Sequence, residues 1–155
     1  MKIKIRKVTL CDVKALLPLI SQLGYPISEE QLIARLALYQ GYNDAAWVAL
    51  VDEKPIGVIA VHVYDLFHCT ERYSRIVTVV VDAPYRRLGV GKQLLAYAER
   101  HAKEKGCTAL ELTSSLKRLK YGAHDFYDSY GYNNHGEYES RYFRKFLKQK
   151  EGPVI

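Results

Sequence analysis

The chain has 155 residues, of which 48% are hydrophobic and 26% charged, and its formal net charge is +6. This length suits one domain with a single core and is too short for two comfortable ones. No apolar run reaches the length that crosses a bilayer, and residues 1–6 lack the continuous apolar stretch of a signal peptide. We therefore expect one domain over residues 1–150, a tail at 151–155, a cytoplasmic location and no membrane attachment.

The positive charge favours anionic partners in general, including nucleic acid, membranes and phosphorylated cofactors. Much of the excess lies in residues 117–120 and 141–150, and neither segment resembles the long basic block of a nucleic-acid tail. The three cysteines cannot all pair and show no CxxC spacing, which favours reduced thiols. His62, His68 and Cys69 lack a fourth ligand at suitable spacing, so we expect no metal.

The first 41 residues predict a strand and two helices. Residues 2–7 alternate as in a strand, and Thr9 is a plausible N-cap for a helix that ends near Gly24. Ser28 begins a second helix, which Gly41 ends. The apolar faces of the two helices are expected to consist of Val13, Leu16, Leu17 and Ile20, and of Leu32, Ile33, Leu36 and Leu38.

From residue 45 the pattern changes to strands. Residues 46–51 and 56–64 are expected to form an antiparallel hairpin around the turn at 52–54. A third strand, about residues 73–82, contains the β-branched run 76–81, which is typical of a strand buried on both faces.

The remainder predicts two helices and two strands. A helix over 88–105 should turn one side to the core, and a short buried strand follows at 109–113. A helix over 121–130 and a last strand over 138–146 complete the chain, with room for an extra strand near Tyr132. The core residues of the first of these helices are expected to be Leu94, Leu95, Ala98 and Ala102.

The resulting order is β-α-α-β-β-β-α-β-α-β. It predicts a mixed α/β domain whose central sheet is antiparallel first and parallel around the third helix.

The most informative stretch is residues 79–92, where a valine-rich strand runs through a turn into a helix. Free amides in a first helical turn, together with the positive end of the helix dipole, form an anion site. Glycines at 89 and 91 remove side chains that would keep a phosphate from the backbone, and Arg86, Arg87 and Lys92 add positive charge. The pattern indicates a phosphate or pyrophosphate site.

Two other phosphate motifs fail on spacing. A P-loop needs a glycine at position 86 and Ser or Thr after the lysine, where this chain has Arg86 and Gln93. A Rossmann fingerprint needs a third glycine where Leu94 stands. A turn that uses glycine only for tightness remains an alternative.

Arg86-x-x-Gly89-x-Gly91, between a valine-rich strand and an amphipathic helix, resembles motif A of the GNAT superfamily of acetyl-CoA-dependent N-acetyltransferases. The segment from Ala123 to Tyr132 resembles that family's motif B. The element order is similar to the family's across residues 3–147. The resemblance implies acetyl-CoA as the acetyl donor, an amine as acceptor, no metal and a possible homodimer.

The resemblance also implies roles for individual residues. The pantetheine arm would lie against the backbone of Val79, Val80 and Val81, where one amide polarises the thioester carbonyl. Tyr127 would protonate the departing thiolate, because a phenol stays protonated at neutral pH. Lys120 stands where many members carry a pantetheine-contacting asparagine, so Ser114 or Ser115 would supply that contact. The pyrophosphate would rest on Arg86, Arg87, Leu88, Gly89, Val90, Gly91 and Lys92.

The acceptor side is less defined. Candidate general bases are Glu71, Asp65, His68 and Glu111, each of which can equally be an ordinary surface residue. A concentration of tyrosines suits a flat or cationic acceptor, or a dimer interface; these are Tyr25, Tyr39, Tyr42, Tyr64 and Tyr73. Two other functions stay open: a CoA-binding sensor without catalysis, and a basic nucleic-acid-binding protein, which the sequence does not favour.

Overall fold

The computed structural model describes residues 1–134 and 142–147. The strands are β1 (Lys4–Lys7), β2 (Ala45–Val51), β3 (Lys54–Asp65), β4 (Arg72–Val81) and β5 (Ala109–Glu111). The α-helices are α1 (Val13–Ser21), α2 (Glu29–Leu38), α3 (Val90–Glu104) and α4 (Ala123–Ser129). Short 3-10 helices cover Leu10–Asp12, Ala83–Tyr85 and Leu116–Tyr121.

Local capping explains where the first helices begin. Thr9 and Asp12 form a capping box in which the Asp12 carboxylate accepts the Thr9 backbone N–H at 2.8 Å. Ser28 caps α2 by accepting the Gln31 N–H at 3.1 Å, and the Gln31 side chain returns a bond to the Ser28 N–H at 2.9 Å. Both predicted N-caps are therefore confirmed, although a 3-10 turn precedes α1.

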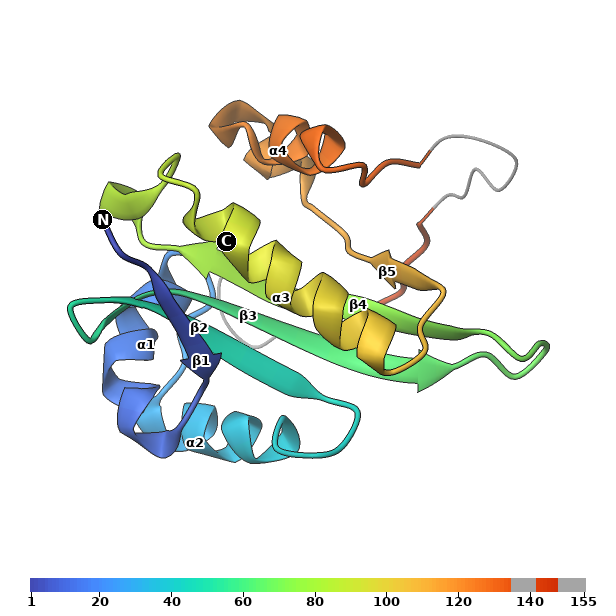
Figure 1. The fold of residues 1–155 in the computed structure, drawn as a ribbon, viewed down its shortest axis with the longest axis horizontal. Helices are drawn as coiled ribbons and strands as arrows, with labels where there is room; N and C mark the ends of the chain where they lie inside the picture. Colours follow the sequence, from blue (N-terminus) through green and yellow to red (C-terminus); the bar gives the residue numbers. More distant parts are fainter. Residues whose placement is uncertain (135–141, 148–155) are drawn as a thin grey trace. The chain divides into compact units, whose positions relative to one another are not determined.

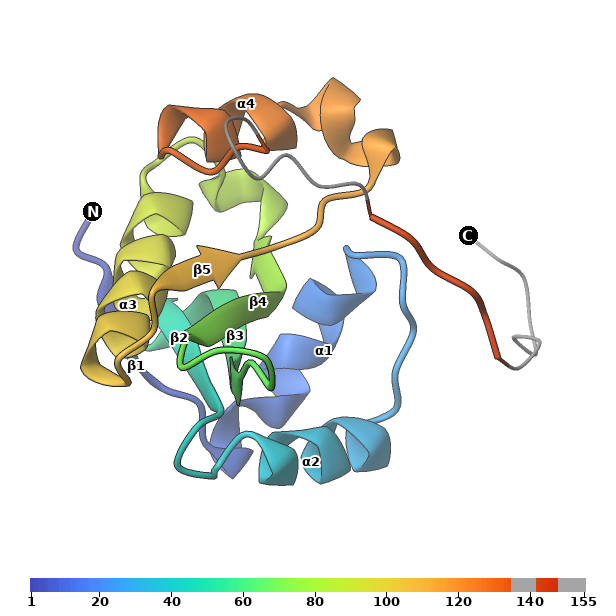
Figure 2. The same cartoon turned by 90° about the vertical axis from the view of Figure 1, so that its right-hand side faces the viewer.

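The five strands form one sheet in the order β1-β2-β3-β4-β5. All neighbours are antiparallel except β4 and β5, which are parallel and joined through α3. Helix α3 covers one face of this sheet, and α1 and α2 cover the other (Figures 1 and 2). The predicted mixed α/β class, with a sheet that becomes parallel around the third helix, is confirmed.

The core fills both sides of the sheet. On the α3 face, the four predicted residues Leu94, Leu95, Ala98 and Ala102 are all buried. Gly57 on β3 lets α3 approach closely, since a Cβ there would lie 3.2 Å from both a Leu94 methyl group and the Val80 carbonyl oxygen. On the α1/α2 face, a cluster comprises Val8, Val13, Leu16, Leu19, Leu36, Val48, Leu50, Val58 and Val80.

Two core predictions are wrong. Ile33 and Leu38 are 41% and 59% exposed, because Leu36 supplies the buried contact of α2 and only one narrow stripe of this helix faces the sheet. Strand β4 is not buried on both faces throughout. Val77 is 43% exposed, because its neighbours pair as Ala60↔Thr78 and Val61↔Ile76, which leaves it as an extra residue in a β-bulge.

Several boundaries also differ. Helix α3 begins at Val90, since Leu88 belongs to the preceding turn and is 54% exposed. The helix predicted over 121–130 is divided by Gly122 at φ 74° into a 3-10 helix and α4, which ends near Gly131 as expected. No strand forms over the described residues 130–134. Of the strand predicted over 138–146, residues 138–141 lie outside the described residues, and 142–146 form no strand.

The chain divides into two compact units, residues 1–112 and the segment from Thr113 onward. The first contains the whole sheet with α1, α2 and α3, and the second contains α4. Within the described ranges, no helix is both long and apolar enough to span a membrane.

Candidate active site

Strands β4 and β5 run together for only three residue pairs. The pairs are Tyr73↔Ala109, Ser74↔Leu110 and Arg75↔Glu111. Beyond Arg75, β4 continues for six more residues to Val81, and no described strand pairs with that edge. The sheet therefore has an open edge along the second half of β4.

Hydrogen bonding to β3 determines which groups face this open edge. The Asp82 N–H donates to the Ile56 carbonyl at 2.8 Å, so Asp82 points toward β3. Because antiparallel residues alternate, Val80 also directs its backbone groups to β3, whereas Val79 and Val81 direct theirs to the open edge. The Val80 side chain is 6% exposed and belongs to the α1/α2-side core. Of the three predicted valines, Val79 and Val81 thus direct backbone groups to the open edge, and Val80 does not.

The turn after β4 presents a row of free amides. Arg87 and Gly89 adopt positive φ values of 61° and 83°, and α3 begins directly afterwards. The first N–H that enters the helical pattern is that of Gln93, which donates to the Gly89 carbonyl at 3.2 Å. Over the described residues, the six amides from 87 to 92 donate no hydrogen bond within the chain. Unpaired amides at a helix N-terminus form an anion site.

The Arg86 side chain is already engaged within the protein. Its Nε donates to the Val81 carbonyl at 2.9 Å, and its Nη2 donates to Gln22 Oε1 at 2.9 Å. Gln22 follows α1 directly, and its amide nitrogen donates to Asp82 Oδ1 at 2.8 Å. Arg86 therefore connects the end of β4 to the end of α1, whereas Arg87 and Lys92 are exposed and form no ion pair with any described residue.

Two predicted residues lie in the second unit. Ser115 caps the 3-10 helix by accepting the Lys117 N–H at 3.3 Å, and its carbonyl accepts from His124 at 3.2 Å. The neighbouring Ser114 hydroxyl is buried and has no partner among the described residues. The Tyr127 ring packs edge-on against Phe126, with centroids 5.3 Å apart. Burial raises the pKa of the Tyr127 phenol above its ordinary value.

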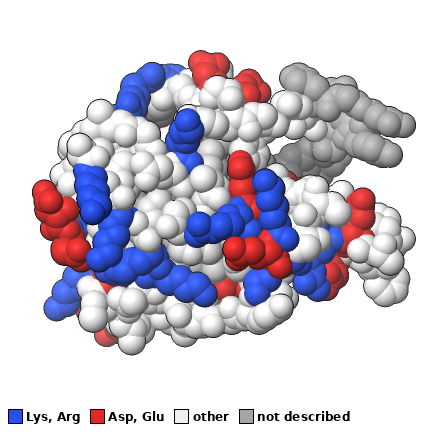
Figure 3. Space-filling model, viewed as in Figure 1, with Lys and Arg blue, Asp and Glu red and all other residues white. Residues whose placement is uncertain are grey.

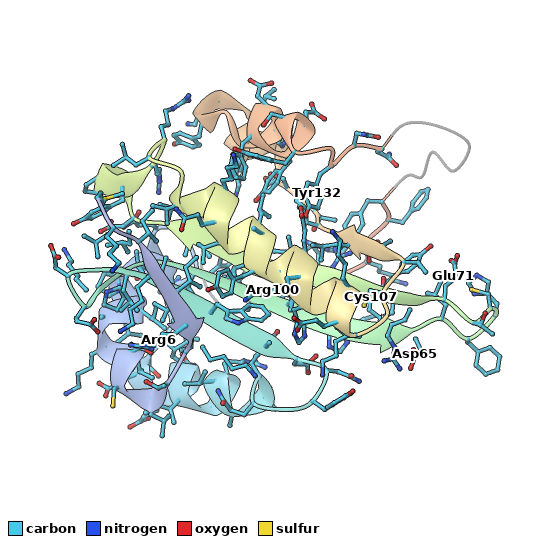
Figure 4. The ribbon with its side chains drawn as sticks, in the orientation of Figure 1. Arg6, Asp65, Glu71, Arg100, Cys107 and Tyr132 are labelled. Carbon is cyan, nitrogen blue, oxygen red and sulfur yellow. The ribbon has the colours of Figure 1, made fainter. Side chains whose placement is uncertain are left out.

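The predicted base candidates have different surroundings. Asp65 is held by Arg72 through two bonds of 2.7 and 3.1 Å at the base of the β3–β4 loop, and Glu71 accepts from the Tyr73 hydroxyl at 3.3 Å. Both lie toward the far end of that hairpin (Figure 4). His68 is an exposed residue of the loop itself. None of the three is near the bulge at Val77 in strand register.

Glu111 is the candidate that lies where β4 and β5 part. Its carboxylate accepts from Arg75 at 3.2 Å and from the Tyr64 hydroxyl. Burial, followed by the bond to Glu111, raises the pKa of Tyr64 to about 12, so this phenol stays protonated at neutral pH. The Tyr64 and Tyr73 rings lie 6.2 Å apart, so two of the five predicted tyrosines gather here.

A second polar pair lies beside this network. His62 Nδ1 is 2.6 Å from Asp44 Oδ1, and the His62 ring stacks on Tyr64 with centroids 5.9 Å apart. In the linear sequence His62 suggests only a metal ligand, since nothing in the local pattern brings residues 44 and 62 together. The described residues contain no group of three metal-ligating side chains.

An apolar pocket of about 210 Å³ lies between α1, α2 and the sheet. Its floor is formed by Val58, Ala60 and Thr78, and Arg35 and Tyr39 are its polar members. Tyr39 is one of the five tyrosines predicted on the acceptor side, and it lines this pocket. Burial raises the pKa of its phenol. Tyr25 and Tyr42 are exposed, and Tyr42 instead lies under the Lys105 ammonium, which is 3.3 Å from its ring centroid.

The structure thus combines a sheet that opens between two parallel strands with an amide-lined helix start, an arrangement that suits a phosphorylated ligand. Residues 15–132 match the model of the acetyltransferase (GNAT) family, and the chain belongs to that family.

Among curated proteins, the chain is 35% identical over 85 residues to aminoalkylphosphonate N-acetyltransferase of Salmonella typhimurium. That match covers 55% of the chain and 54% of the relative, so the chain spans about half of that relative's length. It is 27% identical over 149 residues to glucosamine 6-phosphate N-acetyltransferase of Arabidopsis thaliana, covering 90% of the chain and 96% of the relative. An aminoglycoside N-acetyltransferase solved with CoA has the same fold, with a TM-score of 0.78, 20% identity and coverage of 95% and 96%.

Proposed function

We propose that this protein transfers an acetyl group from acetyl-CoA to a primary amine of a small molecule, by direct attack of the amine within a ternary complex. One observation carries this proposal: the six unpaired amides from 87 to 92 lie at the start of α3, directly after the open edge of β4. An anion site joined to an unpaired strand edge suits a ligand with a phosphate end and an amide-containing arm.

Acetyl-CoA supplies the activated acetyl group as a thioester. Val79 and Val81 would bind its arm through backbone groups on the open edge, and one of these amides would stabilise the negative charge that develops on the carbonyl oxygen. The amides from Arg87 to Lys92 would bind the pyrophosphate, with the Arg87 and Lys92 side chains adding charge. Arg86 would act indirectly, by fixing the turn that presents these amides.

Tyr127 is the proposed donor of a proton to the departing sulfur. This role comes from its match to the motif B tyrosine. The direction of its pKa shift supports the role, since a phenol whose pKa is raised by burial keeps its proton at the pH where acetyl transfer occurs. Ser114, with its unsatisfied buried hydroxyl, is a better candidate than Ser115 for a polar contact to the ligand.

The acceptor is proposed to be a small cationic molecule with an apolar portion. The carboxylates of Asp44 and Glu111 suit an ammonium group, and the 210 Å³ pocket suits a short carbon skeleton. Two relatives are named as acetyltransferases of aminoalkylphosphonate and of glucosamine 6-phosphate, which supports an amine of small size. On the face seen in Figure 3, Lys and Arg side chains gather at the lower left, and Asp and Glu side chains lie at the left edge and near the centre.

The experiment has two stages. Calorimetric titration with acetyl-CoA measures binding, and release of CoA thiol then measures transfer to a panel of amino sugars, aminoalkylphosphonates, polyamines, amino acids and peptides. Absence of binding at millimolar acetyl-CoA would disprove the assigned cofactor site. Binding without transfer to any amine would instead support a CoA-binding protein that lacks catalysis.

A further inference from the structure

The stretch of β4 beside the open edge carries no group that could remove a proton from the acceptor. From Ile76 to Val81 every side chain is aliphatic except that of Thr78, and the bulge residue Val77 exposes only an aliphatic side chain. An alkyl ammonium group must lose a proton before its nitrogen can attack a thioester. If acetyl transfer occurs beside β4, as the proposed function requires, the proton acceptor must come from a neighbouring element.

The sheet register identifies that element as β3. Val58 and Ala60 line the apolar pocket, and Ala60 pairs with Thr78 next to the bulge. Because strand side chains alternate, His62 lies on the same sheet face as these two residues. It is two residues beyond Ala60, which corresponds to about 7 Å along the strand. A molecule in the pocket therefore has His62 as the next β3 side chain on its face.

The contacts of His62 suit a base. Its Nδ1 lies 2.6 Å from the Asp44 carboxylate, which fixes the neutral imidazole with its proton on Nδ1 and leaves the Nε2 lone pair available. Over the described residues, Nε2 has no hydrogen-bond partner, and the side chain is 49% exposed. The Tyr64 ring stacks against the imidazole with an interplanar angle of 14°, which restricts its rotation.

The ionisable groups next to His62 on the sheet are already paired, and Arg35 and Tyr39 of the pocket lie on the same face, where Tyr39 interacts electrostatically with Asp44. The Glu111 carboxylate accepts from both Tyr64 and Arg75, and Arg75 is the cross-strand partner of His62. The groups around the imidazole are thus Asp44 from the loop before β2, Tyr64 on β3, Arg75 on β4 and Glu111 on β5. Of these groups, Asp44 is the carboxylate in direct contact with the imidazole.

We infer that His62, oriented by Asp44, accepts the proton that the acceptor ammonium loses before it attacks. The ammonium gives one proton to Nε2, and the nitrogen lone pair then forms the N–C bond as the C–S bond breaks. The sulfur leaves as the thiolate, and the nitrogen gives its second proton to water. The imidazolium returns its proton to water. His62 is thus a catalytic residue, and Asp44 is a positioning residue.

The test compares His62→Gln and Asp44→Asn with the wild type, using the best acceptor from the amine panel. The matched control is Asp52→Asn, the same chemical change at an exposed carboxylate in the β2–β3 turn. Acetyl-CoA affinity and kcat are measured from pH 6 to pH 10. His62→Gln should lower kcat at pH 7 by about 100-fold, since general base catalysis contributes roughly this much. Its acetyl-CoA affinity should stay within about twofold.

The pH profile distinguishes a base from a structural residue. The deficit of His62→Gln should shrink as the pH approaches the pKa of the free amine, where solution supplies the neutral nucleophile. Asp44→Asn should lower kcat less than His62→Gln, because the imidazole is retained and only its orientation by the carboxylate is lost. A deficit that is equal at every pH, or unchanged kcat in His62→Gln, would overturn the assignment while leaving the acetyltransferase proposal intact. A wild-type protein that acetylates no amine would overturn both.

Discussion

The guanidinium of Arg86 donates from Nε to the carbonyl oxygen of Val81 at 2.9 Å, and so joins the end of β4 to the turn that begins α3. In the linear motif this arginine looks like a phosphate ligand. In the folded chain, Nη2 of the same guanidinium donates a second hydrogen bond to Gln22 Oε1. The arginine is therefore placed to shape the anion site from within the protein.

Replacing Arg86 tests this indirect role. Arg86→Ala should weaken acetyl-CoA binding by about tenfold, since the turn loses two charge-assisted hydrogen bonds of about 1 kcal/mol each at an exposed site. Arg86→Lys keeps the charge but cannot make both contacts, so it should lose nearly as much affinity. Calorimetric titration measures both. If lysine restores full affinity, the arginine acts on the phosphate by charge and our interpretation is wrong.

Gly89 should be sensitive to any side chain. Its φ of 83° strains other residues by about 1–2 kcal/mol, although a Cβ would meet no atom within 4 Å. Gly89→Ala should therefore reduce the free energy of unfolding modestly and reduce acetyl-CoA affinity at least tenfold, since the Cβ enters the space beside the free amides. Gly41→Ala is the matched control, because it also meets no atom within 4 Å and has no positive φ. Equal affinities in the two variants would remove the anion site from this turn.

Tyr127→Phe should separate chemistry from binding. Loss of the phenolic proton should lower kcat by about 10- to 100-fold while the acetyl-CoA affinity changes little. Because burial raises the pKa of Tyr127 above its ordinary value, ionisation of this phenol should not reduce wild-type activity at pH values below 10. Tyr130→Phe, on the same α4 turn and 40% exposed, is the control. Identical kcat values for the Tyr127 and Tyr130 variants would make Tyr127 a packing residue.

Asp12 should make stability depend on pH. Burial alone would raise the pKa of this carboxyl, but bonds from Arg6 at 2.7 and 2.8 Å and from Thr9 outweigh it and hold the pKa below its ordinary value. Because the pKa of Asp12 is lower in the folded state than in the unfolded state, its ionised carboxylate stabilises the protein at pH values above the unfolded-state pKa near 4. This stabilisation is lost as the pH falls through the folded-state pKa.

Asp12→Asn should therefore lower the free energy of unfolding at pH 7 by about 2 kcal/mol, less than for a fully buried pair because the Arg6 side chain is 34% exposed. Urea denaturation should show this difference shrinking below pH 4. The exposed pair of Lys4 and Glu53 is the comparison, and Glu53→Gln should cost no more than about 0.5 kcal/mol. A difference for Asp12→Asn that stays constant down to pH 2 would contradict the assignment.

Much of the fold follows from local chemistry that is visible in the sequence. Thr9 and Ser28 cap helices because their side chains reach amides only two or three residues away. The positions of β2, β3 and β4 along the chain and the burial of Leu94 and Leu95 follow from periodicity. Periodicity failed at Val77, since a β-bulge depends on the register of a partner strand and leaves no mark in a run of aliphatic residues.

The sequence by itself determined the family and the fold class. It also predicted the anion site, because the amides from 87 to 92 are contiguous and their glycines and basic residues are local signals. Only the tertiary structure decided the role of Arg86 and the pairing of His62 with Asp44. These contacts join residues 64 and 18 positions apart along the chain. The geometry of these contacts depends on how α1 packs on the sheet and on how β2 and β3 align. Neither can be predicted from a local sequence pattern.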